Sequence, residues 1–511
     1  FKPKDYWTIS ATSRGYRLNW RGKKGNTRIF DKKYADSIVQ KVKGKNGKIT
    51  EIKKESKREP APLLYDLTEL QRDANRKYGY SAKQTLSIMQ RLYEFHKIVT
   101  YPRTDSRYIT DDIVPTLAER LKSVSVGPYA QFSREIIKSG VKTTKRLVDN
   151  TKVTDHHAII PTEEFVNLGS LSFDERNIFD LIVKRFLAML SPAFEYEQTT
   201  IFADINGETF TARGRVIKSK GWKEIYDGQN DDLNQDNDEQ EQSLPDIKKG
   251  EAFSPLSVEL VSGKTKPPAR FTEATLLTAM ESPGKYVDDD RLRETLDKSG
   301  GLGTPATRAD IIEKLFNSFY IEKQGKEIIP TSKGIQLISI VPEELKSAEL
   351  TAKWEQKLEM ISRGKANPDK FVEDMRKYAS QLVSKVVASS DVYKHDNLTR
   401  ERCPDCGKFL LDVKGKRGRM LVCQDRECGF KKTVSIISNA RCPQCHKKME
   451  IRGEGQDKSF YCSCGYREKV DSYNKKKEKS VSKKEVNRFM RQQNDHEINT
   501  ALADALAKWK E

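Results

Sequence analysis

The first 402 residues contain no cysteine, and all eight cysteines of the chain lie between Cys403 and Cys464. Secreted disulfide proteins rarely confine their cysteines in this way, so the pattern indicates a metal-binding module in a reducing cytoplasm. The chain also lacks an apolar run of about 20 residues, which a membrane-spanning helix needs, and no signal peptide is expected at its start. Its first residue is Phe1 rather than methionine, which predicts either a processed chain or a fragment.

Positive charge exceeds negative charge: 93 Lys and Arg stand against 74 Asp and Glu, giving a formal net charge of +19. Such an excess attracts polyanions, so nucleic acid is the first partner to consider. A ribosomal protein or a membrane-surface protein carries a similar excess, and charge alone does not separate these classes. A length of 511 residues is too great for one hydrophobic core and predicts about three or four domains.

Hydrophobic periodicity divides the chain into alternating β-rich and helical segments. Ser81 is expected to cap a helix that runs through Tyr93, and Asn206-Gly207 is a strong hairpin-turn signal. The order β, helical, β predicts one β domain interrupted by a helical insertion, hence a mixed α+β multidomain protein. The expected segments are 1–62 (β-rich, first part), 63–195 (mainly helical), 196–268 (β-rich, second part), 269–390 (helical), 400–432 and 440–468 (two metal ribbons) and 469–511 (basic linker and tail helix).

Two stretches have the composition of disordered chain. The first, "DGQNDDLNQDNDEQEQ" at 227–242, is acidic and nearly devoid of apolar residues. Its carboxylates suggest metal binding, but the composition favours a solvated loop. The second, "NKKKEKSVSKKE" at 474–485, is basic and suited to loose phosphate contacts. A short amphipathic helix, "INTALADALAKWK", is expected to close the chain.

The cysteines form two groups of four, each opening with C-P-x-C followed by a second pair. Two thiolates on a tight knuckle, met by two more from a second turn, make the tetrahedral four-sulfur site that zinc prefers. Because all four positions are filled by protein, such a zinc ion holds a fold and does not catalyse. The predicted ligand sets are Cys403, Cys406, Cys423 and Cys428 for one tandem ribbon, and Cys442, Cys445, Cys462 and Cys464 for the other.

Aromatic residues are interleaved with Lys and Arg in these ribbons. Two interpretations remain open for each ring: it stacks on a base of single-stranded nucleic acid, or it forms the small core of the ribbon. The rings are Phe409, Phe430, Phe460, Tyr461 and Tyr466.

The stretch "IVTYPRTDSRYIT" at 98–110 places Tyr101 beside Arg103 and Arg107. A phenol, with an ordinary pKa near 10, is a poor nucleophile at neutral pH. It can attack a phosphodiester only where cations stabilise the phenolate and the transition state. The stretch alone fits a nucleophile and a polar turn after a buried strand equally well.

Two further motifs carry groups that bind phosphate. "VTDHHAIIPTE" at 153–163 holds a histidine pair, which is usually structural but beside a tyrosine–arginine site offers a phosphate ligand or proton carrier. "DKSGGLGTPATRADIIEKL" at 297–315 combines a Gly-rich loop and Pro305 with a helix expected from about Thr307, whose free N–H groups can receive a phosphate. This loop has no G-K-[ST] ending, so ATP is not indicated.

Taken in order, six motifs resemble those of type IA DNA topoisomerases, most closely bacterial topoisomerase III, over Phe1 to about residue 390. They are "LQRDANRKYGYSAKQTL", "VTYPRTDSRY", "DHHAIIPT", "PPARFTEATLLTAM", "GLGTPATRADII" and "TAKWEQKLEMI". The resemblance implies a toroid whose domains enclose a hole for duplex DNA, with a β-rich arch interrupted by the tyrosine-bearing domain. The zinc ribbons are similar to the C-terminal tails of many family members.

The resemblance also implies a reaction and its residues. A tyrosine cuts one strand, forms a 5′-phosphotyrosyl bond, lets DNA pass and reseals the break without ATP. Tyr101 matches the nucleophile, Arg103 the group that stabilises the scissile phosphate, and His156 the histidine that supports cleavage. The expected DNA contacts are Arg107, Arg270 and Thr307. The expected setting is a monomer on single-stranded DNA at the bacterial nucleoid, in the cytoplasm.

One part of the family pattern has no counterpart here. Type IA enzymes begin with a Toprim domain whose Lys, Glu and D-x-D-x-E cluster bind Mg²⁺ and act on the leaving oxygen. No such cluster precedes Tyr101, and the acidic stretch at 227–242 lacks its spacing. The resemblance therefore implies a fragment without the Toprim domain, inactive by itself, with Mg²⁺ required in the full-length enzyme.

Two rival interpretations are kept. The first is a non-catalytic protein that binds single-stranded nucleic acid and retains the toroid and ribbons. The second is a tyrosine recombinase or type IB enzyme, which forms a 3′-phosphotyrosine. The latter enzymes carry their tyrosine late in the chain, whereas Tyr101 has most of this chain after it.

Overall fold

The computed structural model describes residues 1–13, 15–226, 242–287, 289–298, 300–389, 397–415, 418–425, 427–453 and 455–479. The chain divides into two compact units, Phe1–Asp391 and Val392–Glu511. The two units contain separate sheets and separate hydrophobic cores, and each unit is described by itself below.

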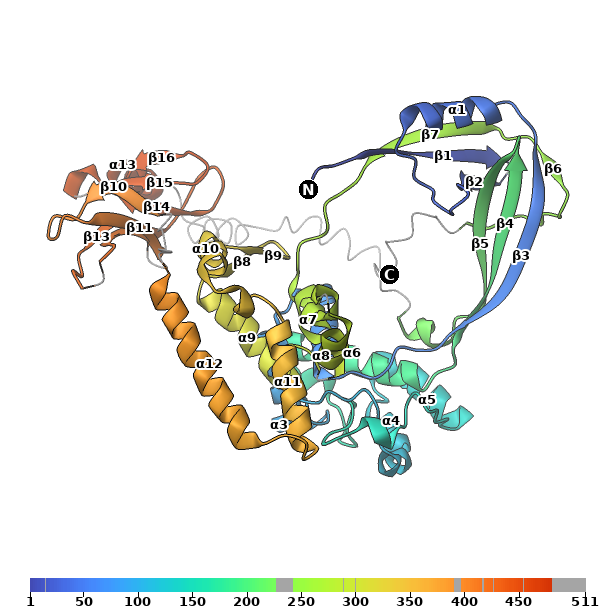
Figure 1. The fold of residues 1–511 in the computed structure, drawn as a ribbon, viewed down its shortest axis with the longest axis horizontal. Coiled ribbons are helices and arrows are strands. Elements are labelled where there is room, and N and C mark those ends of the chain that lie inside the picture. Colours follow the sequence, from blue (N-terminus) through green and yellow to red (C-terminus); the bar gives the residue numbers. More distant parts are fainter. Residues whose placement is uncertain are drawn as a thin grey trace, which may run out of the picture. The chain divides into compact units, whose positions relative to one another are not determined.

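The first unit contains an antiparallel seven-stranded sheet in the order β6-β3-β4-β5-β2-β1-β7 (Figure 1). Its strands are β1 (Asp5–Ser13), β2 (Tyr16–Trp20), β3 (Gly47–Glu59), β4 (Phe194–Ile205), β5 (Glu208–Ser219), β6 (Ala252–Phe253) and β7 (Ser257–Lys264). Strands β3 and β4, which flank the helical insertion in the sequence, are neighbours in the sheet and pair directly. The hairpin between β4 and β5 turns at Asn206 and Gly207, with φ of 52° and 81°, which confirms the predicted turn.

A helix that the sequence interpretation missed covers this sheet. Helix α1 (Lys32–Val42) lies against β1 and β7 (Figure 1). The Asp31 side chain accepts hydrogen bonds from the backbone of Lys33 and Tyr34 and so caps the helix. Ala35, Ile38 and Val42 are buried in the sheet's core. Residues 1–62, predicted to be β-rich, do contain β1, β2 and β3, but α1 was not predicted among them, because its few apolar residues lie between charged residues that obscure the helical period.

The insertion between β3 and β4 holds the largest core of the molecule. Its helices are α2 (Leu67–Tyr78), α3 (Ala82–Glu94), α4 (Leu117–Ser123), α5 (Ala130–Ser139) and α6 (Phe173–Met189). The Ser81 side chain accepts from Gln84 N, so the predicted cap is confirmed. Residues 140–172 are less helical than expected, with short 3₁₀ turns only, because their backbone pairs instead with Tyr65, Val99 and Ile109.

Helix α6 is anchored by one buried carboxylate, Glu175. Burial alone raises the pKa of Glu175, but hydrogen bonds from Arg91 and Ser172 outweigh it and lower the pKa to about 2. A carboxyl group whose pKa is lower in the folded protein stabilises the fold at pH values above its pKa in the unfolded chain. This stabilisation is lost as the pH falls through the pKa of the folded state. We expect Glu175→Gln to destabilise the first unit by about 2 kcal/mol at pH 7, with a smaller difference at pH 3.

Urea unfolding of wild type and variant at both pH values measures this difference. Glu94→Gln, an exposed carboxylate on the neighbouring helix α3, is the matched control and should change little at either pH. A Glu175→Gln penalty that is equal at pH 7 and pH 3 would contradict the ion-pair explanation.

The remainder of the first unit is helical apart from one hairpin. Its elements are α7 (Glu273–Glu281), α8 (Asp290–Lys298), α9 (Pro305–Asn317), β8 (Ile321–Gln324), β9 (Glu327–Pro330), α10 (Ser332–Ile340), α11 (Glu349–Ser362) and α12 (Pro368–Ala388). Helix α9 begins at Pro305 rather than at about Thr307, because proline is favoured in the first turn of a helix. The β8–β9 hairpin turns at Gly325, with φ of 65°, and was not expected in the helical segment 269–390.

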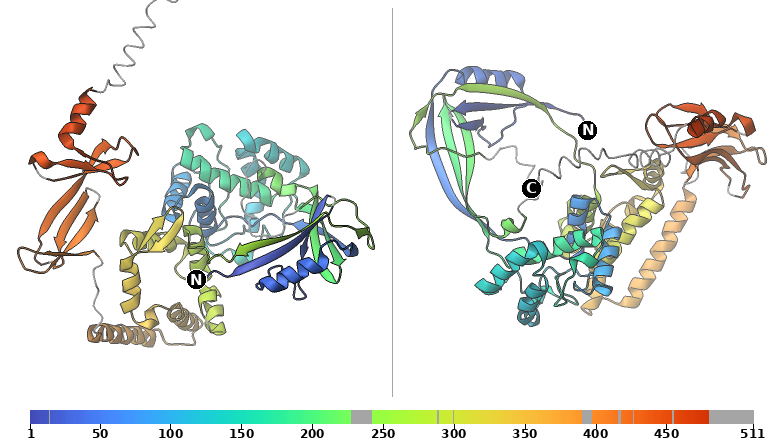
Figure 2. Two further views of the ribbon diagram at one scale, coloured as in Figure 1. Left: turned by 90° about the horizontal axis from the view of Figure 1, so that it is seen from above. Right: turned by 180° about the vertical axis from the view of Figure 1, so that it is seen from behind.

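The second unit is a meander of seven antiparallel strands in chain order (Figure 2). They are β10 (Leu398–Arg402), β11 (Phe409–Gly415), β12 (Gly418–Cys423), β13 (Lys431–Arg441), β14 (Lys448–Arg452), β15 (Ser459–Tyr461) and β16 (Arg467–Lys469). The long strand β13 pairs with β12 on one side and β14 on the other. The two cysteine groups thus share one sheet.

Helix α13 (Val470–Lys479) follows the last strand. Tyr473 holds it: its ring lies 4.8 Å from that of Phe460 and its hydroxyl donates to the Arg441 carbonyl. The expectation of disorder from residue 474 is wrong up to Lys479, because these side-chain contacts extend the fold into the basic stretch. Residues 480–511, including the expected tail helix, and 227–241 of the expected acidic loop lie outside the described residues. Among the helices that are described, none could span a bilayer.

Candidate active site and metal centres

The tyrosine loop, residues 100–109, is held in place by buried hydroxyl groups. Thr104 Oγ1 donates to the His156 carbonyl at 2.8 Å and accepts from Ser106 N at 3.0 Å. Ser106 Oγ donates to the Lys152 carbonyl at 2.8 Å. Thr104 and Ser106 are buried, so these bonds satisfy polar groups that would otherwise be unpaired. The predicted turn residues therefore bind the tyrosine loop to the histidine segment.

Tyr101 and His156 lie ring against ring. Their centroids are 4.2 Å apart with planes tilted by 35°, and the Tyr93 ring meets Tyr101 edge-on at 5.6 Å. Tyr101 is half-buried, and it opens onto a pocket of about 270 Å³. The pocket is lined by Thr100, Tyr101, Thr110, Asp112, Val153, Thr154, Asp155, His156 and His157. Neither Tyr93 nor Asp112 was singled out from the sequence, because only the folded chain brings them to the phenol.

The two adjacent histidines differ in their surroundings. His157 is half-buried, and its Nδ1 lies 2.8 Å from the Ala158 carbonyl, a hydrogen bond that requires the proton on Nδ1. Burial lowers the pKa of His157, so this ring is neutral at pH 7. His156 is exposed to solvent beside Tyr101. Of the pair, His156 is thus the one available to a ligand.

The two arginines of the tyrosine loop also differ. Arg103 is exposed and makes no hydrogen bond or ion pair within the described residues. Arg107 is instead paired with two carboxylates: Nε lies 3.2 Å from Asp66 Oδ2, and a terminal nitrogen lies 3.2 Å from Glu69 Oε2. Burial raises the pKa of Asp66 to about 6, although Arg107 opposes the shift. Arg107, predicted as a DNA contact, is therefore engaged by the protein.

The Gly-rich loop before α9 is built around a buried arginine, Arg308. Its guanidinium donates to the carbonyls of Leu302, Gly300 and Gly303. Gly301 has φ of 81°, and a Cβ there would lie 2.2 Å from the Met280 carbonyl oxygen, so only glycine fits. The sequence interpretation noted the loop but missed Arg308, because an arginine inside a helix gives no signal of burial.

Thr307 and Arg270 lie at the surface. The Thr307 hydroxyl accepts from Thr304 N at 2.8 Å and so closes the first turn of α9, while its side chain stays exposed. Arg270 is exposed just before α7 and has no polar partner in the described part of the chain. Neither residue lines the Tyr101 pocket.

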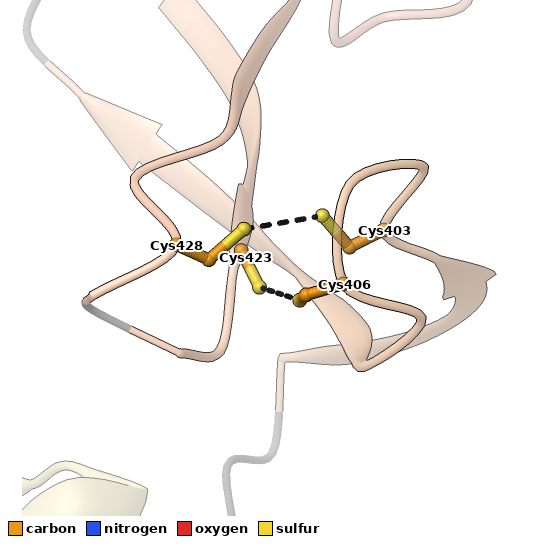
Figure 3. A group of neighbouring side chains, drawn as sticks. All are labelled: Cys403, Cys406, Cys423 and Cys428. Carbon is orange, nitrogen blue, oxygen red and sulfur yellow. Dashed lines mark hydrogen bonds between the residues drawn. The ribbon is translucent and has the colours of Figure 1, made fainter.

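Each cysteine group brings four thiols together, and Figure 3 shows the first group, Cys403, Cys406, Cys423 and Cys428. The sulfurs of each group lie within 4.8 Å of one another, with two Sγ–Sγ separations of 3.4 Å and 3.6 Å in the first group and two of 3.3 Å and 3.5 Å in the second. A disulfide needs about 2.05 Å, whereas metal–sulfur bonds of about 2.3 Å in a tetrahedron place sulfurs about 3.8 Å apart. Both groups therefore fit a metal ion with four thiolate ligands.

The two knuckles, each carrying the first two cysteines of its group, have the same backbone conformation. Gly407 N donates to the Cys403 carbonyl and His446 N donates to the Cys442 carbonyl, each at 2.9 Å. Gly407 and His446 both have positive φ, 72° and 59°. This turn aims the thiols of each C-P-x-C pair at the same point, as the spacing predicted.

Two aromatic residues of the ribbons, Phe460 and Tyr461, differ in their surroundings. Phe460 is buried with Met449 and Cys442 and forms the core of the second ribbon. Tyr461 is half-buried and flanked by Arg452 and Arg467, whose guanidinium carbons lie 4.8 Å and 4.9 Å from the ring centre. The surroundings of Tyr461 suit stacking with cationic support.

Comparison with known proteins decides the family. A sequence model described as DNA topoisomerase matches residues 1–373. The chain is 53% identical over 519 aligned positions to DNA topoisomerase 3 of Bacillus cereus, and 52% identical over 515 to that of Bacillus subtilis. These alignments cover 100% and 99% of the chain and 71% of each relative. The chain belongs to the DNA topoisomerase family.

Within that family, the predicted likeness to type IA enzymes and to topoisomerase III is confirmed by these relatives. The full-length topoisomerase I of Thermotoga maritima shares the fold, with a TM-score of 0.56 and 24% identity over 86% of this topoisomerase chain and 68% of that one. The predicted mixed α+β class with two C-terminal cysteine ribbons is confirmed as well.

Proposed function

We propose that this topoisomerase chain carries the nucleophile that cleaves one DNA strand. The Tyr101 hydroxyl gives up its proton to solvent as its oxygen attacks a phosphodiester; a bond from this oxygen to phosphorus forms, and the bond from phosphorus to the 3′ oxygen breaks. The leaving 3′ oxygen takes a proton, and the DNA remains attached through a 5′-phosphotyrosyl bond. Resealing runs the same steps backward, so ATP is not needed. The pairing of the Tyr101 and His156 rings at 4.2 Å in an open pocket carries this proposal.

The neighbouring groups supply charge and hydrogen bonds for the phosphate. Arg103 is an exposed cation two residues after Tyr101, suited to stabilise the transition state. His156 donates to a phosphate oxygen or carries a proton. The first turn of α9, which carries Thr307, and the exposed Arg270 contact the DNA backbone away from the pocket. After cleavage, DNA passes through the break before religation.

Trapping the covalent adduct tests this function. A single-stranded oligonucleotide is incubated with Mg²⁺ and with the protein completed to the length of its relatives, of which this chain covers 71%. We expect DNA that remains attached to protein in denaturing gels. DNA that is bound in native gels but always released by detergent would contradict cleavage and favour the non-catalytic binding protein.

The chain alone is expected to behave differently. Among the described residues, the sets of three or more close metal-binding side chains are both composed of cysteine. They do not fit Mg²⁺, which prefers oxygen ligands. We expect the 511-residue chain to bind single-stranded DNA without relaxing negatively supercoiled plasmid in Mg²⁺. Relaxation by the purified chain would contradict this expectation.

We infer that the two cysteine groups hold structural zinc. Four thiolates and no open position suit zinc and leave it no catalytic role. The ribbons, with Tyr461 between Arg452 and Arg467, hold the single-stranded substrate. The protein acts as a monomer on DNA in the cytoplasm, at the nucleoid. Its relatives are bacterial, which supports the bacterial setting.

A further inference from the structure

Arg107 faces protein carboxylates rather than the open pocket. Its side chain is 31% exposed, and its two carboxylate partners, Asp66 and Glu69, are 6% and 18% exposed. Its Nε is buried and has no hydrogen-bond partner, so the contact with Asp66 is an ion pair without hydrogen-bond geometry. A phosphate that bound Arg107 would have to displace these carboxylates, and leaving their buried negative charge without a partner costs free energy. Arg107 is therefore poorly suited to contact DNA.

The carboxylate partners belong to the start of α2. Asp66 caps this helix by accepting from Glu69 N at 2.7 Å. Glu69 forms ion pairs with two arginines, because its Oε2 also lies 2.5 Å from a terminal nitrogen of Arg72. Arg72 in turn donates to Glu281 of α7 at 2.7 Å. The ion pairs thus run without interruption from the tyrosine loop through α2 to α7.

Backbone and side-chain hydrogen bonds join the same helical turn to the tyrosine loop and to the Gly-rich loop before α9. Leu67 N donates to the Thr104 carbonyl of the tyrosine loop at 3.1 Å. Arg308, which holds the Gly-rich loop, donates to Thr68 Oγ1 at 3.1 Å. The first turn of α2 therefore lies between the tyrosine loop and the loop before α9.

We propose that Arg107 is a positioning residue, which with Asp66 and Glu69 holds the tyrosine loop on the first turn of α2. The proposal rests on the proposed function of Tyr101. Reaction requires the phenol oxygen in line with the phosphate, and a displacement of about 1 Å costs about 100-fold in rate. Arg107 acts through the position of Tyr101 and does not touch the DNA.

Three variants in the completed protein test this role: Arg107→Gln, Asp66→Asn and the double variant. Asparagine also caps helices well, so Asp66→Asn removes the charge and keeps the start of α2. At saturating DNA we expect each single variant to form adduct about 10- to 100-fold more slowly. The double variant should be no slower than the slower single variant, because the ion pair that Asp66→Asn removes is already lost in Arg107→Gln.

DNA affinity separates positioning from phosphate contact. We expect the Kd of Arg107→Gln for single-stranded DNA to stay within about twofold, with the same salt dependence as wild type. Arg107→Lys keeps the charge and should recover part of the rate. Arg134→Gln, which removes an exposed arginine of α5, is the matched control and should form adduct at the wild-type rate.

The proposal would be overturned, and Arg107 would be a phosphate contact, by three results together. Arg107→Gln would bind DNA with a weaker Kd and with a salt dependence of affinity lower by about 1, and its rate of adduct formation at saturating DNA would be unchanged. Failure of the wild type to form adduct would instead contradict the proposed function. In that case hydrogen exchange still tests the structural link: Arg107→Gln should accelerate exchange of the Leu67 amide, and unchanged exchange would overturn it.

Discussion

Tyr101→Phe is expected to reduce covalent adduct formation by at least about 10⁴-fold in the completed protein, because no other group can replace the attacking oxygen. The substitution removes one oxygen and keeps the ring that lies 4.2 Å from His156, so the pocket and DNA binding should persist. A labelled single-stranded oligonucleotide, quenched in detergent over a time course, measures adduct. Fluorescence anisotropy with the same oligonucleotide measures binding.

Tyr93→Phe is the matched control. Its ring lies 5.6 Å from that of Tyr101, which makes it the nearest alternative phenol, and we expect this variant to keep adduct formation. Adduct that persists in Tyr101→Phe and disappears in Tyr93→Phe would reassign the nucleophile. Adduct that persists in both would move it outside this pair.

Loss of metal is expected to have the second largest effect, confined to the second unit. Zinc bound by four thiolates in small domains contributes roughly 10–16 kcal/mol of binding free energy at pH 7, which exceeds what a small ribbon core supplies. We expect Cys442→Ser, at a fully buried ligand, to lower the zinc content from two ions to one, as two ligand groups require. Elemental analysis measures the metal, and limited proteolysis detects unfolding of the second ribbon.

The first unit provides the internal control for this experiment, because its core contains no cysteine. Residues 1–391 should resist protease equally in wild type and in Cys442→Ser. Chelation of both ions followed by an unchanged protease pattern of the ribbons would contradict a structural role for the metal.

Local features of this fold could be predicted because neighbouring residues determine them. The Ser81 cap, the Asn206-Gly207 hairpin and the two cysteine knuckles each depend on a few adjacent side chains. Helix α1 was missed because its three buried residues are spread among charged ones. Helix α13 was missed because Tyr473 packs on Phe460, a tertiary contact that the composition of the stretch does not reveal.

The candidate site could be predicted in its residues but not in its contacts. The motif order correctly pointed to the family, and the pocket does combine Tyr101 with His156. The two arginines of the loop looked equivalent in sequence. Only the fold separates the exposed Arg103 from Arg107, since the carboxylates that engage Arg107 lie on a preceding helix. The different environments of His156 and His157 likewise depend on packing.

In the proposed reaction, Tyr101 becomes joined to the 5′ side of the broken strand. The most direct test is to trap the adduct on an oligonucleotide labelled at either end, digest protein and DNA, and sequence the modified peptide by mass spectrometry. We expect one modified residue, Tyr101, carrying the 5′-phosphate of the downstream fragment and leaving a free 3′ hydroxyl upstream. A modification on another residue, or a 3′-phosphotyrosyl bond, would contradict it.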